Sequence, residues 1–409
     1  MKTFHELYLD MLKQETAQGR KLEGEYDPYH LDCLLHPERH APVIFVDQCE
    51  QCEYDKACEN SCVFDAFEHG EDGKVSINME KCVGCGACVD ACKLEKLAEN
   101  KDVVPVLKAL REKKGQVYAL VAPAFWGQFG EEVTTGKLRA AFKAVGFQGM
   151  IEVAVFADIL TLKEALEFDA NVMEEKDYQL TSCCCPVWIS LIRNLYNELM
   201  PHVPAAVSPM IAAGRVVKKL HPEAVTVFIG PCIAKKKEAK EPDIADAVDY
   251  VLTFQEVRDM FEAADIKPEL LGDDEKEHSS KAGRIYARTG GVSQAVKETV
   301  AQLNPARGIE VKAEQADGVP ACRAMIERLK NGETTANFFE GMACNGGCVG
   351  GPKAIVPKDE GRKNIDQYAE AADYKTPLEN PFVMELLSRL GFKTIDEFLE
   401  KSDIFVRQF

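Results

Sequence analysis

Long apolar runs are missing from this 409-residue chain, and no stretch approaches the length needed to cross a membrane. The N-terminus, Met1 to Leu7, lacks the hydrophobic core of a signal peptide. We therefore expect no membrane partner and a cytoplasmic location. Low-complexity tracts are missing too. With 46% hydrophobic and 28% charged residues, the composition is that of a globular protein of two or three domains.

An excess of basic residues is also missing. The chain has 49 Lys and Arg against 67 Asp and Glu, a net charge of −18, which disfavours nucleic acid and anionic membranes as partners. An acidic electron carrier would need a local basic patch, for which Lys108, Arg111, Lys113 and Lys114 are available. We favour a solvated run of charges as the explanation of these four.

Cysteine, in contrast, is abundant, with sixteen residues. In a cytoplasmic protein this number predicts metal or redox chemistry and not disulfides. Most of these cysteines fall into two quartets and three short islands. The exceptions are Cys33 and Cys322. Cys33 has His30 and His36 nearby, but such groups are more often incidental than metal-binding, and Cys322 is expected to be a buried structural cysteine.

The two quartets have ferredoxin-like spacing. The second, Cys82-x2-Cys85-x2-Cys88-x3-Cys92, is the bacterial ferredoxin run, and the first, Cys49-x2-Cys52-x5-Cys58-x3-Cys62, is the same run with a longer first loop. Zinc ribbons also use such pairs, but zinc sites rarely use the full run. In two-cluster ferredoxins the fourth cysteine of each run binds the other cluster. We therefore assign Cys49, Cys52, Cys58 and Cys92 to one [4Fe–4S] cluster and Cys82, Cys85, Cys88 and Cys62 to the other.

Changes in composition divide the chain. Residues 46–100 are short, cysteine-rich and punctuated by glycine, as expected where clusters replace a hydrophobic core. From residue 116 the chain alternates apolar runs with amphipathic helices. We expect an N-terminal segment (1–45, with a helix over 3–18), a ferredoxin-like α+β domain (46–100), a helical connector (101–115), a catalytic domain (116–365) and a C-terminal helical segment (366–409).

The region after residue 116 has the pattern of an α/β domain. Four apolar runs predict buried strands: Val117–Ala122, Ile151–Phe156, Val225–Ile229 and Tyr250–Phe254. Helices are predicted after them at Leu138–Ala144, Leu160–Phe168, Ile189–Leu199 and Val257–Ala264. Ligands of such sheets bind beyond the carboxyl ends of the strands. Pro123, Cys184, Cys185 and Cys232 fall at or after strand ends, so we expect them in one cleft.

The cysteine islands are Thr181-Ser182-Cys183-Cys184-Cys185-Pro186-Val187-Trp188, Gly230-Pro231-Cys232-Ile233-Ala234-Lys235-Lys236, and Glu340-Gly341-Met342-Ala343-Cys344-Asn345-Gly346-Gly347-Cys348. They resemble the three signature segments of the [FeFe] hydrogenases, and the resemblance covers about residues 115–355. It implies a two-lobed α/β catalytic domain around a central cleft. It also implies an H-cluster, in which a [4Fe–4S] cubane is joined to a diiron unit carrying CO, cyanide and a bridging dithiolate amine.

The resemblance also implies ligands. Cys185, Cys232 and Cys344 would bind the cubane, and Cys348 would bridge both units. The family usually has two cysteines before the proline, whereas this chain has three. The spacing of Pro186, Trp188 and Glu164 favours Cys184 as the free thiol and Cys185 as the ligand. The alternative, with Cys183 free and Cys184 as the ligand, stays open.

A proton path follows from the same resemblance. Cys184 would relay protons to the bridging amine, because a thiol both donates and accepts. Glu164 and Glu167 match two carboxylates of the family's path, although a pair at this spacing is by default a solvated helix face. Two departures affect its outer part: Pro204 stands in place of a serine and Asn171 in place of an arginine.

Other positions around the cofactor follow in the same way. Lys235 would donate to a cyanide ligand, which a cation in a dry cleft favours; a surface lysine is the alternative. Ala122 and Pro123 match the first cleft loop, and Met342 is expected to pack near the cluster. Gly230 replaces the methionine usual before Pro231, and we expect this change to open space beside the cluster.

The leading hypothesis is therefore a hydrogenase that interconverts protons, electrons and H₂. A slow H₂ sensor and a hydrogenase-like iron–sulfur assembly protein are the alternatives. The chain keeps Cys184, Lys235 and Cys348 and has no obvious signalling module, which favours the enzyme. Because no flavin fingerprint is present, the expected electron partner is a soluble carrier such as ferredoxin or flavodoxin, and maturation proteins would supply the diiron unit.

Overall fold

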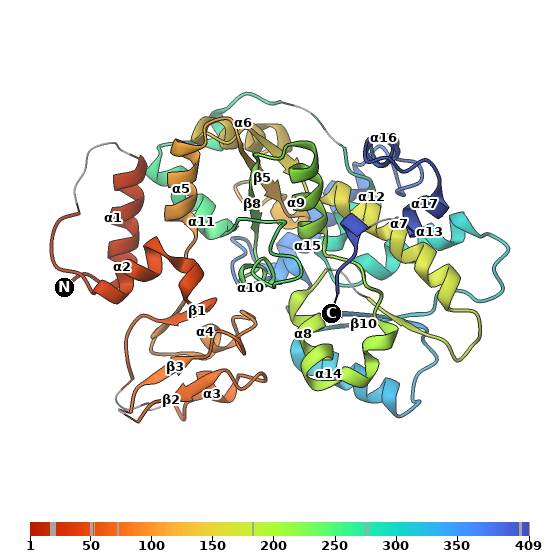
Figure 1. Ribbon diagram of the computed structural model, residues 1–409, viewed down its shortest axis with the longest axis horizontal. Coiled ribbons are helices and arrows are strands. Elements are labelled where there is room, and N and C mark those ends of the chain that lie inside the picture. Colours follow the sequence, from red (N-terminus) through yellow and green to blue (C-terminus); the bar gives the residue numbers. More distant parts are fainter. Residues whose placement is uncertain are drawn as a thin grey trace.

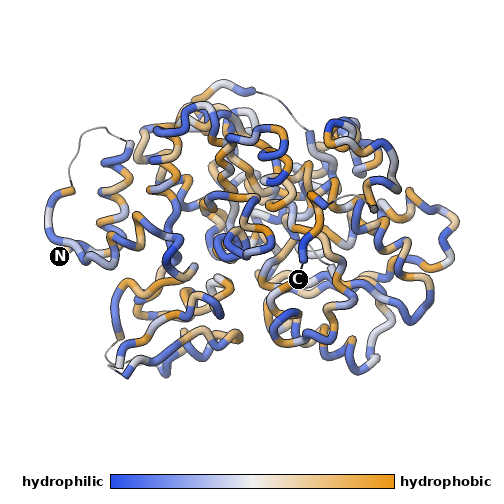
Figure 2. Tube along the Cα trace, viewed as in Figure 1, coloured by the Kyte–Doolittle hydropathy of each residue, from blue (hydrophilic) through white to orange (hydrophobic). Residues whose placement is uncertain are grey.

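A four-stranded parallel sheet forms the centre of the molecule (Figure 1). The computed structural model describes residues 1–16, 22–49, 52, 54–71, 73–181, 184–274, 276, 278–400 and 403–408. The strands are ordered β6 (Gly149–Glu152), β5 (Val117–Val121), β8 (Val225–Gly230) and β9 (Tyr250–Thr253). Hydrophobic residues are concentrated here (Figure 2). Helices flank the sheet: α6 (Thr135–Val145), α7 (Ala154–Asn171), α9 (Pro209–Leu220) and α11 (Phe254–Ala263).

One of the four predicted strands is largely wrong. The run Ile151–Phe156 begins in β6, but the strand ends at Glu152 and α7 starts at Ala154. Thirteen of the eighteen residues of α7 are buried, from Ala154 to Phe168. A helix buried on nearly all sides has the same continuous apolar sequence as a buried strand, so periodicity alone does not separate the two.

A second parallel sheet lies beside the first and was not predicted. Its order is β10 (Ala313–Asp317), β11 (Phe338–Met342) and β7 (Gln179–Leu180). It packs with α8 (Pro186–Leu195) and α14 (Val319–Lys330), at the lower right of Figure 1. The predicted helix Ile189–Leu199 is split between α8 and the 3-10 segment η3 (Asn197–His202).

The ferredoxin-like region lies at the lower left of Figure 1. It pairs β1 (Val43–Phe45) with β4 (Leu97–Glu99) and β2 (Phe67–His69) with β3 (Val75–Ile77), all antiparallel. Two short helices, α3 (Ala57–Asn60) and α4 (Ala87–Ala91), contact each other. Because β1 pairs with β4, this unit includes residues 43–45, which the sequence had placed in the N-terminal segment.

The N-terminal segment and the connector pack on the large core. Helices α1 (Phe4–Thr16), α2 (Pro28–Leu35) and α5 (Val103–Glu112) contact one another, and α1 also contacts α11. Leu7, Tyr8 and Leu12 are fully buried there. The first helix thus covers the lobe built on the four-stranded sheet, and the connector helix buries one apolar face while Lys108 and Arg111 stay exposed.

The C-terminal part of the chain is helical and packs against the rest of the molecule. Helix α15 (Lys358–Glu370) runs across the expected boundary at residue 365, and α16 (Pro381–Arg389) and α17 (Ile395–Glu400) contact α7. The remaining helices are α10 (Ala234–Glu238), α12 (Lys281–Arg284) and α13 (Gly291–Leu303). The predicted mixed α/β class, with parallel sheets flanked by helices, is confirmed.

Candidate functional site

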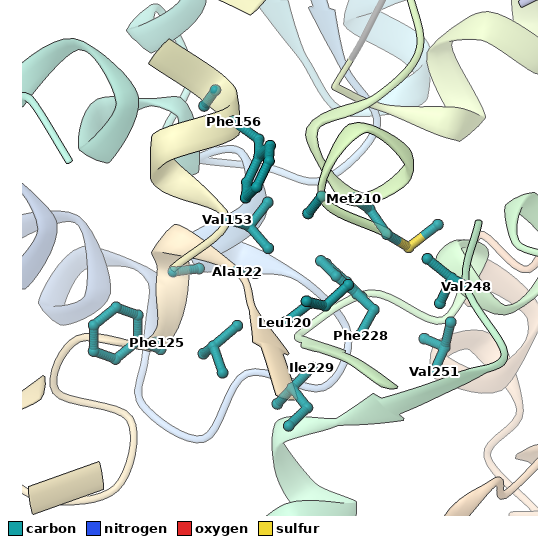
Figure 3. Close-up of a cluster of buried hydrophobic side chains, with 14 of the residues drawn as sticks. Leu120, Ala122, Phe125, Val153, Phe156, Met210, Phe228, Ile229, Val248 and Val251 are labelled. Atoms are coloured by element: carbon teal, nitrogen blue, oxygen red, sulfur yellow. The ribbon is translucent and has the colours of Figure 1, made fainter. Parts of the chain in front are cut away.

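A cavity with about 730 Å³ of empty space lies where the two parallel sheets end. It is lined by residues that follow the carboxyl ends of β5, β6, β7, β8 and β11. Its walls are mostly apolar, and Ala122, Val153, Met210 and Phe228 from this lining appear in Figure 3 among the core side chains. The expected position beyond the strand ends is therefore observed.

Five cysteines line this one cavity. They come from three loops that follow strand ends, and each cysteine is partly exposed. Cys183 lies outside the described residues. Both assignments of the triplet, with Cys185 or with Cys184 as the ligand, therefore stay open. The five are Cys184 and Cys185 before α8, Cys232 between β8 and α10, Cys344 after β11, and Cys348 in the 3-10 segment η6 (Cys348–Gly350).

The thiols lie close enough to affect one another. Burial, followed by the charge of Cys185, raises the pKa of Cys232 to about 11. Burial, followed by the charges of Cys232 and Cys185, raises the pKa of Cys348 to about 12. A thiolate in this place therefore needs compensating positive charge, which an iron–sulfur cluster supplies when it displaces the protons. The donor set fits a thiolate-bound cluster in the middle of the cavity.

Backbone and packing fix the loop that carries Cys185. The residue is the N-cap of α8, and the backbone N–H of Ala343 points to its Sγ at 3.5 Å. Trp188 anchors the helix, because its Nε1 donates to the Thr181 carbonyl at 3.1 Å. A Cβ on Gly341 would lie 2.1 Å from the Trp188 ring, so only glycine lets β11 approach this helix. The structure thus explains why Trp188 and Gly341 accompany the cysteines.

Lys235 is a buried cation on the cavity wall, not a surface lysine. Its Nζ lies 2.6 Å from the Glu238 carboxylate, one helical turn further on. Burial lowers the pKa of Lys235, but the charges of Glu238, Cys232 and Cys348 outweigh this effect and raise it. The side chain is therefore a fixed ammonium beside the thiols, and the sequence had not identified Glu238 as its partner.

Gly230 does not open the space that was expected. A Cβ there would lie 2.9 Å from the Phe228 ring and 3.1 Å from the Cβ of Ala122. Phe228, labelled in Figure 3, is two residues earlier on β8. It is one of the residues that line the cavity. Because side chains two residues apart share one face of a strand, the phenyl ring of Phe228 occupies the space beside the glycine.

Pro123 and Met342 also line the cavity, with Ala122. Met342 is 1% exposed and is the last residue of β11. Cys322 lies behind this strand end and is buried, as expected, with its Sγ 3.4 Å from the Met342 carbonyl. It does not line the cavity.

Two carboxylates on α7 lie on the inner side of the molecule. Glu164 is fully buried, and its charge contributes to the raised pKa of Cys184, after burial and the charges of Cys348, Cys185 and Glu340. The Glu167 side chain is 17% exposed and pairs with Lys163 at 2.9 Å. The solvated-face alternative is therefore wrong. Asn171, the last residue of α7, is exposed, and Pro204 is half-buried before α9.

Glu340 is a further buried carboxylate near the site that sequence reasoning missed. It accepts hydrogen bonds from the backbone of Gly290 and Ser293, at 2.8 and 2.7 Å, where α13 begins. Its charge raises the pKa of Cys184 and Cys348. The only sequence signal was its place in the third island, next to Gly341.

The ferredoxin-like cysteines form two spatial groups. A small apolar pocket is lined by Cys62, Cys82, Cys85 and Cys88, which combines three thiols of the second quartet with the fourth of the first. Burial, followed by the charge of Cys92 and then those of Cys52 and Cys49, raises the pKa of Cys58. The groups are those expected for crossed ligation. Among the described residues, no three His, Cys, Asp or Glu side chains are placed to hold a single metal ion.

The pocket with Cys85 adjoins the large cavity. Cys85 and Cys344 line one groove between the ferredoxin-like region and the larger lobe, and the charge of Cys85 acts on the Cys344 thiol. Gly84 and Gly86 have φ of 71° and 83°, and they pack against Ala234 and Pro352. Both glycines permit a left-handed backbone and a close approach of the two units.

Comparisons with known proteins agree with this architecture. The family model "Iron only hydrogenase large subunit, C-terminal domain" matches residues 115–352, and a 4Fe-4S binding domain matches residues 73–94. A structure titled for stepwise [FeFe]-hydrogenase H-cluster assembly in HydA(deltaEFG) has a TM-score of 0.59 at 21% identity, over 74% of this chain and 98% of that one. The expected two-lobed hydrogenase fold is thereby confirmed. No helix in the described part of the chain is long and apolar enough to span a membrane.

Curated relatives fall into two groups. The NADP-reducing hydrogenase subunit HndD of Solidesulfovibrio fructosivorans is 25% identical over 90% of this chain and 75% of its own, and the periplasmic [Fe] hydrogenase large subunit of Nitratidesulfovibrio vulgaris is 28% identical over 69% and 87%. The cytosolic Fe-S cluster assembly factor narfl of Xenopus tropicalis is 24% identical over 78% and 80%. Because the family model covers more than half of the sequence, the chain belongs to the iron-only hydrogenase large subunit family.

Proposed function

We propose that this protein is an [FeFe] hydrogenase that catalyses the reversible reaction of two protons and two electrons to H₂. Cys185, Cys232, Cys344 and Cys348 would hold an H-cluster, with Cys348 as the bridging ligand. When bound, the H-cluster supplies the metal site at which electrons and protons combine. The chain's own residues would hold the cluster, keep water away from it and move protons and electrons.

The observation that carries the proposal is the shared cavity. Five thiols and the Lys235 ammonium line one mostly apolar space at the ends of two sheets. A cubane needs four thiolate ligands, so one cavity thiol is left over, and we assign this role to Cys184. A fixed cation beside the thiolates suits anionic ligands such as cyanide, because charge-assisted hydrogen bonds are strong in a dry site. Ala122, Pro123 and Met342 would pack around the cofactor.

Electrons would reach the site through the two ferredoxin-like groups. Cys62, Cys82, Cys85 and Cys88 would bind the inner [4Fe–4S] cluster, next to Cys344. Cys49, Cys52, Cys58 and Cys92 would bind the outer one. The outer group would receive electrons from a soluble carrier such as ferredoxin or flavodoxin in the cytoplasm, and maturation proteins would deliver the diiron unit.

Protons would travel through Cys184, Glu164 and Glu167. The first two are linked electrostatically across the cavity wall, and Glu167 lies one turn further along α7. A thiol and a carboxylic acid both exchange protons by donation and acceptance. With Pro204 and Asn171 in the outer part, the exit to solvent would differ from that of other family members.

An iron–sulfur assembly protein is the second candidate, because the narfl relative covers most of both chains. A protein that only holds ordinary clusters needs neither a fifth thiol nor a buried ammonium in the cavity. A slow H₂ sensor is the third candidate and would share the whole site. Turnover rate separates it from the enzyme.

Infrared spectroscopy tests the proposal. The protein is matured anaerobically with a diiron cofactor and its cubanes are quantified. We expect bands of iron-bound CO and cyanide that change under H₂, their loss in Cys348→Ser, and their retention in Cys322→Ser, whose thiol is buried outside the cavity. Missing bands in wild-type protein with fully loaded cubanes would contradict the hydrogenase proposal and favour the assembly protein.

A further inference from the structure

Helix α7 contains a buried lysine beside the outer carboxylate. Lys163 Nζ lies 2.9 Å from Glu167 Oε1, and the two side chains are 3% and 17% exposed. Residues four apart lie on the same face of a helix, one turn from each other. Glu164, which follows Lys163 in the sequence, is fully buried. The cation therefore lies on the helix that carries both carboxylates of the proposed proton route.

Only one oxygen of Glu167 is engaged by this pair. The other, Oε2, is shielded from solvent and has no hydrogen-bond partner among the described residues. A buried carboxylate oxygen normally has a donor. Lys163 thus fixes the carboxylate through Oε1 and leaves Oε2 as the atom that can take up a proton.

Among the described residues, Lys163 is the only charged group that acts on Glu167. Burial raises the pKa of Glu167, and Lys163, through its charge and its hydrogen bond, opposes this rise. Four cations on or next to the neighbouring helices have partners elsewhere: Arg307 after α13 binds Asp169, Lys281 of α12 binds Glu370, Lys218 of α9 binds Asp249, and Arg389 of α16 binds Glu385. The side chains of residues 395, 396 and 400 in α17 lie outside the description.

We propose that Lys163 is a positioning residue of the proton route, which holds Glu167 as a carboxylate with Oε2 open to accept a proton. The inference rests on the proposed function. The proton arriving from Glu164 would bind Oε2 and leave again toward solvent, or the reverse. Lys163 keeps its own proton throughout, so the carboxylate is restored after each transfer.

A plain structural pair is the competing explanation. An ion pair with a buried partner stabilises folding whether or not protons pass, and its removal leaves an uncompensated charge. A structural role changes stability but not the pH at which the relay works. The test therefore needs a measurement of Glu167 protonation, separate from turnover.

The first experiment follows the carboxylic-acid C=O infrared band of Glu167 against pH in protein that has its cubanes but lacks the diiron unit, with Glu167→Gln to identify the band. Removing the cation removes the group that lowers the pKa. In Lys163→Met we therefore expect the midpoint of the Glu167 titration to rise by about one pH unit or more. In Lys163→Arg this midpoint should stay near that of the wild type. Arg139→Met, which breaks another buried pair (with Glu152), is the control for general destabilisation.

The second experiment measures HD formation from D₂ against pH in loaded protein. We expect Lys163→Met to shift the pH profile of HD formation in the same direction as the titration of the Glu167 band. In a Glu167→Gln background, Lys163→Met should cause no further shift of this profile. An unchanged midpoint, or an equal shift in Arg139→Met, would overturn the inference. A shifted band with an unchanged pH profile would overturn it too. Missing CO and cyanide bands in wild type would instead contradict the proposed function, while the titration would still decide whether Lys163 sets the charge of Glu167.

Discussion

The Cβ that Gly84 lacks would lie 3.0 Å from the Cα of Ala234, so the ferredoxin-like loop and the chain after Cys232 are in direct backbone contact. Gly84 lies between Cys82 and Cys85, which line the inner pocket. Ala234 begins α10, the helix that carries Lys235. The contact joins the inner ferredoxin-like group to the cavity and lies on the proposed electron route.

This contact predicts that Gly84→Ala separates the two units. The new methyl group would meet backbone, which cannot move aside as a side chain does, and φ is 71°. We expect slower reduction of the catalytic cluster by an external donor, with both cubanes still formed. Gly73→Ala is the matched control, since Gly73 has φ of 80° and nothing within 4 Å. Equal rates in both variants would contradict the role of the contact.

Crossed ligation predicts which cluster each substitution affects. Cys62→Ser should perturb the cluster of Cys82, Cys85 and Cys88, which share its pocket. Cys92→Ser should perturb the other, because Cys92 acts on Cys49 and Cys58. The check is electron paramagnetic resonance of each variant, compared with Cys82→Ser and Cys49→Ser as references. A match of Cys62→Ser to the Cys49→Ser spectrum would contradict the assignment.

Removal of the relay thiol should stop turnover and leave the cofactor in place. Cys184 lines the cavity but is not among the proposed ligands. General acid–base groups contribute on the order of 10² to 10⁴ in rate, so we expect Cys184→Ala to lose about that factor in H₂ evolution while CO and cyanide bands persist. The control variant Cys322→Ala should keep both the rate of H₂ evolution and the CO and cyanide bands. Loss of the bands in Cys184→Ala would instead favour the alternative register, with Cys184 as a ligand.

The free energy of unfolding should depend on pH through the titration of Asp158. Burial raises the pKa of this α7 carboxyl to about 6, despite hydrogen bonds from Ser280 and Asn380. A carboxyl with a raised pKa binds more protons in the folded state, so its contribution to stability falls as pH rises. Relative to Asp158→Asn, the wild type should lose about 1 kcal/mol of unfolding free energy between pH 5 and pH 7. Urea unfolding at several pH values measures this difference, and a constant difference would contradict it.

Sequence patterns predicted the first sheet well and the second not at all. The runs at Val117, Val225 and Tyr250 are apolar because their strands are covered on both faces. In contrast, β10 reads Ala-Glu-Gln-Ala-Asp, with only Ala316 buried, and β7 has two residues. Strands this polar or short have no periodic signal, and their pairing depends on contacts between segments far apart in the chain.

The residues of the candidate site were predictable where the spacing of cysteines along the chain carries information. The described cysteines of the islands come together because they follow strand ends, and Lys235 is buried as expected. The ion-pair partners Glu238 and Lys163 were not found, since an acidic or basic residue one turn away looks like any solvated helix face. The space beside Gly230 was misjudged because only the structure places Phe228 there.

The most direct test of the account is HD formation by the matured protein under D₂ in H₂O, followed by mass spectrometry. We expect rapid HD release in wild type, its loss in Cys348→Ser, where the proposed bridging ligand is gone, and its retention in Cys322→Ser. Protein with loaded cubanes and intact CO and cyanide bands that releases no HD would contradict the claim that this chain is a hydrogenase.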